Sequence, residues 1–262
     1  MSDSASENAF EVALTFTSDL CFFLPRAGRA GVLTRRLREK TSIKDVIESC
    51  GVPHTEVDLI KCNGGAVPFE HHVSSDANVR VEGVLHRESE RTPGLQTRSI
   101  AKFVADGHLG KLARDLRLLG FDVAYDSNAV DHALAEISSS QDRALLTRDR
   151  RLLMHRTVRD GYCLRSTDPA EQTVEVLRRY RLAEALAPYT RCIQCNGLLA
   201  RIDKSEVLEQ LEPLTRLYYD DFRRCSGCGK VYWSGSHFAK LERRIEQLRE
   251  RLNRKPEIEI RK

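Results

Sequence analysis

The sequence predicts an α/β protein in which a parallel sheet with helices on both faces follows a smaller α+β unit and precedes a cysteine-rich ribbon. Strand-like apolar runs alternate with helical periodicity over residues 98–188, which is typical of a parallel sheet. Residues 9–87 contain strands around one short helix, and two CxxC pairs lie after residue 188. A chain of 262 residues is long enough for two or three small domains.

The α+β unit is predicted from strand-like alternation and one capped helix. Ser42 precedes an amphipathic stretch over residues 43–50 that Gly51 ends, so a short helix is expected there. Residues 88–97 are polar, contain a Pro-Gly pair and lack periodicity, which predicts a linker. The expected strands are residues 10–16, 21–24, 57–62 and 79–85.

The parallel sheet is expected to begin after this linker. A helix with apolar residues on one face follows the first strand and ends at Gly120, and another is expected over residues 129–138. Asp168-Pro169 opens a further helix, because aspartate is a favoured cap and proline suits the first helical position. The expected strands are residues 100–105, 121–125, 144–147 and 162–164.

Acidic side chains follow three of these strands. Asp106, Asp126 and Asp149 lie at or just beyond the strand ends, and Asp131 lies in the first turn of the helix at 129–138. Right-handed crossovers put the carboxyl ends of parallel strands at one edge, so we expect these side chains to converge. Converging carboxylates repel one another, and a divalent cation is the natural way to hold them. Oxygen ligands suit Mg²⁺ or Mn²⁺, which can activate water for phosphodiester hydrolysis.

Each aspartate also has a local explanation. Asp106 and Asp149 can cap the helices that follow them. Asp126 can be an ordinary turn residue, and Asp131 can serve only its own helix. The hypothesis of a metal site therefore depends on the coincidence of the four positions rather than on any one of them.

The eight cysteines fall into two groups. The regular spacing of the CxxC pairs predicts four thiolates around a structural Zn²⁺. The alternative is two redox-active pairs, which would favour a position beside a βα turn. The paired cysteines are Cys192, Cys195, Cys225 and Cys228. The scattered ones, Cys21, Cys50, Cys62 and Cys163, are expected to be core residues.

Two features flank the expected zinc ribbon. Tyr232 and Trp233 lie among arginines, so they can stack RNA bases or simply pack the ribbon. Residues 236–253 form an amphipathic pattern whose polar face is rich in Arg and Glu. Docking of this helix on the body of the protein is the ordinary interpretation, and a partner surface is the alternative.

Charge and hydropathy narrow the class of protein. The net charge is +4, and Lys and Arg exceed Asp and Glu only in the region after the linker, which is compatible with nucleic acid. The composition predicts a soluble globular protein. No apolar run approaches the roughly 20 residues of a membrane span, and residues 1–8 are polar and acidic, so a cytoplasmic protein is expected.

Three motifs resemble the Mut-seven C-terminal RNase family, a branch of the PIN-like nucleases. They are KFVADGHLGKLAR at 102–114, LRLLGFD at 116–122 and LLTRDR at 145–150. Bacterial members commonly carry a ubiquitin-like β-grasp domain before this region and a zinc ribbon after it. Residues 9–87 resemble such a β-grasp, with GVP at 51–53 and NGG at 63–65. Sulfur carriers of that fold end in a free Gly-Gly tail, whereas this pair is internal.

The resemblance implies a metal-dependent RNase. PIN-like nucleases hold Mg²⁺ or Mn²⁺ with acids that match Asp106, Asp131 and Asp149. Many add a fourth acid just after the last of these, where this chain has arginines, and Asp126 is then a candidate additional acid. The candidate RNA-binding residues are Lys111, Arg114, Arg148, Arg150 and Arg151.

The sequence therefore predicts three domains and is compatible with three functions. The domains are a β-grasp domain at 9–87, a PIN-like RNase domain at 98–188, and a zinc ribbon at 189–235 with a C-terminal helix at 236–253. The leading function is RNA hydrolysis. The alternatives are a non-catalytic RNA- or ribosome-binding adaptor and a toxin-like or regulated nuclease that the β-grasp domain keeps inactive. A protein partner is expected to use the β-grasp domain or the C-terminal helix.

Overall fold

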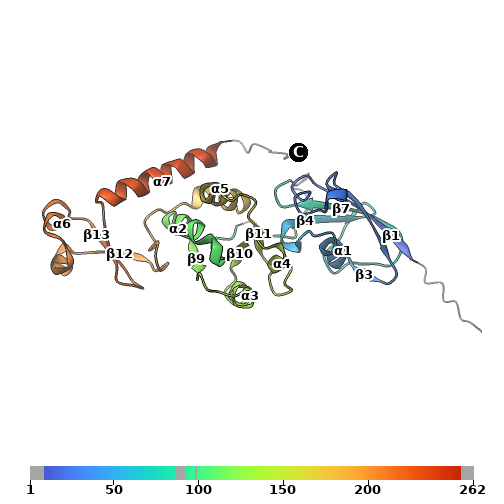
Figure 1. The fold of residues 1–262 in the computed structure, drawn as a ribbon, viewed down its shortest axis with the longest axis horizontal. Coiled ribbons are helices and arrows are strands. Elements are labelled where there is room, and N and C mark those ends of the chain that lie inside the picture. The colour runs from blue at the N-terminus through green and yellow to red at the C-terminus, as the bar shows by residue number, and fades with distance from the viewer. Residues whose placement is uncertain (1–8, 87–91, 98, 255–262) are drawn as a thin grey trace, which may run out of the picture. The chain divides into compact units, whose positions relative to one another are not determined.

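The computed structural model describes residues 9–86, 92–97 and 99–254 (Figure 1). Contacts divide the chain into two compact units. The first contains the residues up to Thr97 together with Thr147–Cys163, and the second contains Arg98–Leu146 together with the residues from Leu164 onward. The expected polar N-terminus at 1–8, residues 88–91 of the expected linker and the domain limits at 87 and 98 lie outside the described residues.

The first unit is built on a mixed five-stranded sheet. Its strand order is β2 (Val32–Leu37), β1 (Phe10–Phe16), β7 (Ala77–Gly83), β4 (Val57–Cys62) and β5 (Gly65–Ala66). β1 and β7 are parallel, and the other neighbours are antiparallel. A separate pair joins β3 (Thr41–Ser42) to β6 (His72–Val73).

Helix α1 (Ile43–Ser49) confirms the predicted capped helix of this unit. The Ser42 hydroxyl accepts a hydrogen bond from the Asp45 amide at 3.1 Å, which satisfies one of the first backbone donors. Gly51 follows the helix with a φ of 95°, a left-handed conformation that glycine adopts readily. The buried side chains of the unit include Val12, Leu14, Ile43, Ile47, Ile60 and Val81.

The strand predicted at residues 21–24 is wrong. This segment forms turns, in which the Leu24 amide donates to the Cys21 carbonyl oxygen at 3.3 Å. The segment is apolar because it contributes buried side chains from a turn, such as Phe23, which is 1% exposed. The missing strand is β2, which pairs only with β1 at the edge of the sheet. No residue of β2 is fully buried, and every second one is exposed. An edge strand of this kind can therefore carry arginines and lacks the regular apolar alternation that predicts a strand.

The segment at 147–163 packs with the β-grasp residues in the first unit. It contains α4 (Arg150–Leu153) and β11 (Gly161–Cys163), the latter confirming the fourth strand expected at 162–164. Within the expected linker, Gln96 is 8% exposed and its side-chain amide donates to the carbonyl oxygens of His54 and Val57 at 2.9 and 3.1 Å. The described end of that segment is thus fastened to the β-grasp residues.

The second unit holds the predicted parallel strands. β8 (Lys102–Ala105) lies between β10 (Ala144–Thr147) and β9 (Asp122–Tyr125), and both pairings are parallel. Helices α2 (Gly110–Leu118) and α5 (Pro169–Arg179) lie on one side of these strands and α3 (Asp131–Ser140) on the other (Figure 1). Phe103, Leu112, Leu116, Val123 and Leu145 form part of its core. The predicted parallel sheet with helices on both faces is confirmed.

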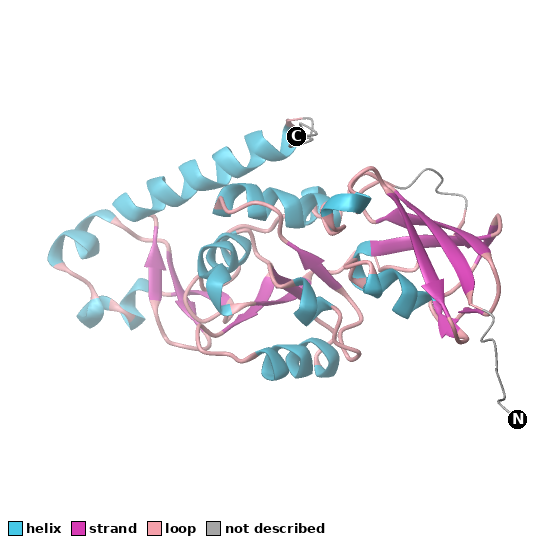
Figure 2. Cartoon of the chain, turned by 45° about the vertical axis from the view of Figure 1, so that its right-hand side comes forward, coloured by secondary structure: helices cyan, strands magenta, loops and turns pink. Residues whose placement is uncertain are grey.

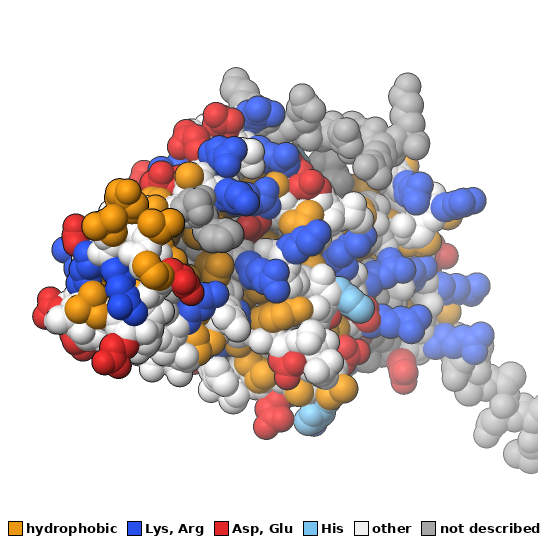
Figure 3. Space-filling view, turned by 60° about the vertical axis from the view of Figure 1, so that its left-hand side comes forward, with side chains coloured by type: hydrophobic (Ala, Val, Ile, Leu, Met, Phe, Trp, Pro, Cys, Tyr) orange, Lys and Arg blue, Asp and Glu red, His pale blue; other side chains and the backbone are white. Residues whose placement is uncertain are grey.

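The ribbon follows this sheet in the second unit (Figure 2). β12 (Leu199–Ile202), β13 (Phe222–Cys225) and β14 (Val231–Trp233) form an antiparallel sheet in that order. An insert at residues 203–221, between β12 and β13, carries α6 (Pro213–Tyr218), which the sequence analysis did not predict. Hydrophobic side chains gather over this insert at the front left of Figure 3.

The C-terminal helix was predicted at its observed position. α7 (Ser236–Asn253) buries Ile245 and Leu248 and contacts α5, which confirms docking on the body of the protein. No helix in the described part of the chain is long and apolar enough to cross a membrane. The short 3-10 helices are Arg26–Gly28, His54–Glu56, Gly107–Leu109, Ala183–Ala185, Lys204–Glu206 and Leu208–Gln210.

Candidate metal centre and active site

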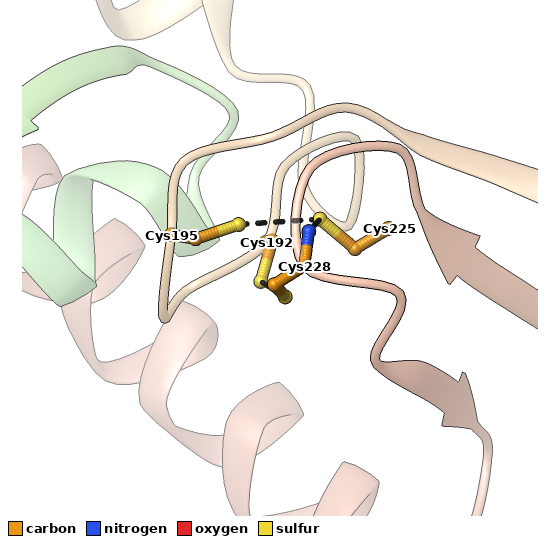
Figure 4. A group of neighbouring side chains, drawn as sticks. All are labelled: Cys192, Cys195, Cys225 and Cys228. Carbon is orange, nitrogen blue, oxygen red and sulfur yellow. Dashed lines mark hydrogen bonds between the residues drawn. The ribbon is translucent and has the colours of Figure 1, made fainter.

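The four paired cysteines form a compact cluster at one end of the ribbon sheet (Figure 4). Their sulfur atoms all lie within 4.8 Å of one another. The closest pairs are Cys195 with Cys225 at 3.3 Å and Cys192 with Cys228 at 3.8 Å. Each pair joins the two CxxC motifs, so the cluster links segments about thirty residues apart in the sequence.

The two CxxC segments have the same local fold. In each, the amide of the fifth residue donates to the carbonyl oxygen of the first cysteine, at 2.9 Å for Asn196 and 3.0 Å for Gly229. These two residues have nearly equal left-handed φ angles of 71° and 73°. Asparagine and glycine tolerate that conformation better than other residues do. The repeated turn aims both cysteines of a pair at the same point.

Donors around the cluster favour a thiolate at one of its sulfurs. Burial raises the pKa of Cys192, but hydrogen bonds from the Tyr232 hydroxyl and the amides of Cys195 and Gln194 outweigh it and lower the pKa to about 6. The Gly197 amide lowers the pKa of Cys195, but burial and the neighbouring sulfurs outweigh it and raise the pKa to about 12. The sulfurs thus share negative charge unevenly, and a cation among them would let all four ionise.

The donor set fits a structural metal. Four cysteine sulfurs in one closed cluster match the tetrahedral ligand set of structural zinc sites, which leave no position for substrate. None of the eight cysteines forms a disulfide. The Tyr232 hydroxyl lies 3.0 Å from the Cys192 sulfur, so this ring supports the cluster from within the ribbon.

Two polar side chains, the buried Arg117 and the partly buried Asp122, attach the first CxxC turn to the parallel sheet. Arg117 is 4% exposed and donates to the Val123 carbonyl oxygen at 2.8 and 3.0 Å and to the Gln194 carbonyl oxygen at 2.8 Å. The Asp122 carboxylate accepts from Arg143 at 2.6 Å and from the Asn196 amide nitrogen at 2.8 Å.

The ionised form of Asp122 is favoured where the first CxxC turn meets the parallel sheet. Burial raises the pKa of Asp122, but the hydrogen bonds from Arg143 and Asn196 outweigh that effect and lower it below its usual value. Arg191 adds a second positive charge, 3.4 Å from the other carboxylate oxygen. The attachment therefore uses paired charges and not apolar contact alone.

Two of the predicted acids end neighbouring parallel strands. Asp106 follows β8 directly, and Asp126 follows β9 directly. The register places the last residues of the two strands, Ala105 and Tyr125, side by side. A Cβ at Gly107 would meet the Ser127 carbonyl oxygen at 2.7 Å, so the two loops touch beyond the strand ends.

Local hydrogen bonds also engage these carboxylates. Asp106 caps the turn that follows it and accepts from the His108 amide at 3.4 Å. Asp126 accepts from the Asn128 amide at 2.9 Å. Asp131 is exposed in the first turn of α3, whose N-cap is Val130. The local roles that these positions suggested in the sequence are present for Asp106 and Asp126.

Asp149 belongs to the first unit. It caps α4 and accepts from the Arg151 amide at 2.7 Å. The segment around it is fastened to β-grasp residues: Arg150 donates to the Phe23 carbonyl oxygen at 3.1 Å, and a His54 ring nitrogen lies 2.7 Å from the Val158 carbonyl oxygen. Among the described residues, only the four cysteines bring three or more potential metal-ligand atoms within 4.8 Å of one another.

Two of the predicted RNA-binding residues line a cavity in the second unit. Lys111 and Arg114 extend from α2 into a cavity of about 340 Å³. Neither residue forms an ion pair within the described part of the chain. The remaining lining residues are Asp115, Asp168, Pro169, Ala170, Arg244 and Arg251.

Ion pairs that were not predicted from the sequence frame this cavity. Arg244 of α7 pairs with Asp115 of α2, and Arg251 pairs with Asp168 at 3.3 Å. The Glu171 amide lowers the pKa of Asp168 most, with burial opposing it. A signal for Asp115 exists in the sequence, because it occupies the apolar face of its helix between Leu112 and Leu119. Its partner, 129 residues away, leaves no local signal.

Comparison with known families agrees with this architecture. The Mut7-C ubiquitin family model matches residues 9–88, and the Mut7-C RNAse domain model matches residues 101–245. No curated protein and no solved structure matches the chain. The RNAse domain match spans more than half of the 262 residues and includes the parallel sheet, the acids that follow β8 and β9, and the cysteine cluster. The chain therefore belongs to the Mut7-C RNAse domain family.

Proposed function

We propose that this protein is a metal-dependent ribonuclease that hydrolyses phosphodiester bonds of RNA. The observation that supports it most is that two neighbouring parallel strands within the RNAse domain match, β8 and β9, are each followed directly by an aspartate. Asp106, Asp131 and Asp149 are the proposed ligands of Mg²⁺ or Mn²⁺, and Asp126 is the proposed additional acid. Carboxylate oxygens are the ligands that these hard cations prefer.

Each proposed residue has a definable task. A divalent ion held by these carboxylates would supply a hydrolytic water at neutral pH and would neutralise charge on the phosphoryl group. Asp106 is positioned by the hydrogen bond that its carboxylate accepts from the His108 amide and by the close approach of Gly107 to the loop at Ser127. Lys111 and Arg114 are proposed to bind RNA phosphates at the cavity beside α2, where arginine can engage two oxygens at once. Arg148, Arg150 and Arg151 are proposed as further phosphate contacts.

The cysteine cluster is proposed to hold one structural Zn²⁺. Its role would be to fix the fold of the ribbon, because zinc ligation contributes folding free energy directly. We further propose three domains, a β-grasp domain at 9–87, an RNase domain at 98–188 and a ribbon at 189–235 with the helix at 236–253. Packing of the segment at 147–163 with β-grasp residues suggests that the β-grasp domain influences the placement of Asp149.

An RNA-binding adaptor without catalysis is the second candidate. It is favoured by the local hydrogen bonds that Asp106, Asp126 and Asp149 already accept from nearby amides. The arginines after Asp149, in place of a further acid, point the same way.

Cleavage assays separate the two candidates. Structured and single-stranded RNAs are incubated with the protein in Mg²⁺, Mn²⁺ or EDTA, and wild type is compared with Asp149→Asn. Loss of about 100-fold in rate is expected, similar to the loss of one strong electrostatic contact with a transition state. Asp142→Asn, an exposed aspartate in the turn before β10, is the control and should keep full activity. Equal cleavage by wild type and Asp149→Asn would refute the metal site, and tight RNA binding without cleavage would assign the adaptor.

A further inference from the structure

The insert at residues 203–221 is a folded element that leaves an apolar face uncovered. Val207, Leu211 and Phe222 form a small core, with Ile202, Tyr219 and Val231 packed against it. A capping box between Asp203 and Glu206 orders its start. The insert therefore has its own hydrophobic contacts and needs no further apolar side chain at its surface to fold.

Helix α6 nevertheless presents three large apolar side chains to solvent. Leu214, Leu217 and Tyr218 are 68%, 68% and 70% exposed, and only Thr215 is buried in this helix. Positions i, i+3 and i+4 lie on one face of a helix, so the three side chains form one patch. Single exposed apolar residues are ordinary, but a contiguous group on one short helix marks an interaction site.

Acidic residues border this patch. Residues 203–221 contain six Asp or Glu and two Lys or Arg, in a chain whose net charge is +4. Lys204 is already paired with Asp220 at 2.8 Å, and the Arg216 side chain donates to the Leu211 carbonyl oxygen at 2.8 Å. Glu209 and Glu212, before α6, form no ion pair within the described residues. Figure 3 shows both acidic and basic side chains beside the hydrophobic group.

We infer that the patch, Leu214, Leu217 and Tyr218 with Glu209 and Glu212, is a docking surface for a basic protein segment that carries apolar side chains. Burial of the three apolar side chains supplies attraction, and the carboxylates select positive charge. The same carboxylates repel a phosphate backbone, so this surface is unsuited to RNA. The inference does not depend on the proposed nuclease activity, because the patch shares no residue with the acidic strand ends.

Fluorescence anisotropy with a defined probe tests this inference. The full chain is titrated into a labelled amphipathic peptide of leucine and lysine at helical spacing, and into the same peptide with glutamate in place of lysine. The lysine peptide should bind, and the glutamate peptide should bind at least about tenfold more weakly. The triple variant that combines Leu214→Ser, Leu217→Ser and Tyr218→Ser should bind the lysine peptide about tenfold or more weakly than wild type does.

Two further variants make the test specific. Glu209→Gln with Glu212→Gln keeps the apolar face and should weaken binding several-fold while reducing its dependence on salt. Leu198→Ser changes another exposed leucine of the ribbon, 57% exposed and outside the insert, and should bind as wild type does. Circular dichroism and zinc content should be unchanged in all variants, because the altered side chains lie at the surface.

Three results would overturn the inference. One is equal affinity of the triple variant and wild type for the lysine peptide. Another is loss of single-stranded RNA binding in the triple variant, which would assign the patch to nucleic acid. The third is a sedimentation coefficient that rises with protein concentration in wild type but not in the triple variant, which would assign it to a second copy of the chain.

Discussion

Arg117→Met is expected to loosen the attachment of the ribbon to the parallel sheet. The guanidinium group is buried and joins three elements, since it lies on α2 and donates to carbonyl oxygens of β9 and of the first CxxC turn. Methionine keeps much of the side-chain volume but donates no hydrogen bond. The variant therefore removes polar contacts with little change in packing.

The magnitude follows from the groups left behind. The Val123 carbonyl oxygen loses both donors inside the protein, and an unsatisfied buried group costs about 1–3 kcal/mol. Gln194 is exposed, so water can replace its lost donor and the cost there is about 1 kcal/mol. Burial lowers the pKa of Arg117, because the charged guanidinium is less stable away from water. Replacing Arg117 with methionine removes this unfavourable burial of charge, which offsets part of the free energy lost with the hydrogen bonds. A net destabilisation of about 2–3 kcal/mol is expected.

Urea denaturation followed by tryptophan fluorescence measures this change. Trp233 is the sole tryptophan of the chain and lies in β14, so its emission reports on the ribbon. Arg114→Met, three residues earlier on α2 and exposed, is the control and should cost less than about 0.5 kcal/mol. Equal denaturation midpoints for the two variants would refute the reasoning that Arg117 fastens the ribbon.

Three other outcomes are expected. Metal analysis should find about one zinc per chain, and Cys225→Ser should lose it and unfold the ribbon; a stably folded metal-free wild type would contradict this. Asp122→Asn should destabilise the protein at pH 7, and because the folded-state pKa of Asp122 is lowered, the difference from wild type should fade below about pH 4 in acid titrations of stability. Gly107→Ala should lower the melting temperature and RNA cleavage together, since its Cβ would clash with the Ser127 carbonyl oxygen, whereas Gly65→Ala, with its nearest neighbour at 3.7 Å, should change cleavage little.

Much of the fold could be predicted because its signals are local. The strands at β8, β9 and β10, the capped helices α1 and α5 and the amphipathic α7 each carry periodicity or caps within a few residues. The CxxC spacing likewise predicted the cysteine cluster, because both turns are made within five residues. The order of acids after strands was visible for the same reason.

Errors arose where neighbours in space are distant in sequence. The apolar segment at 21–24 resembled a strand, but it fills the core from turns, while the edge strand β2 carries arginines. Helix α6 was missed because its apolar residues face solvent rather than a core. Which side chain is buried depends on what covers it, and that is not a local property.

The sequence by itself determined the succession of elements, the two CxxC pairs and the positions of the aspartates along the chain, because short-range periodicity and spacing encode them. Only the tertiary structure decided the pairing of Arg244 with Asp115 and the hydrogen bond from Arg117 to the first CxxC turn. The same holds for the packing of the Asp149 segment with β-grasp residues. These contacts join residues separated by tens to more than a hundred positions. They arise from the close approach of whole elements, which no window of sequence contains.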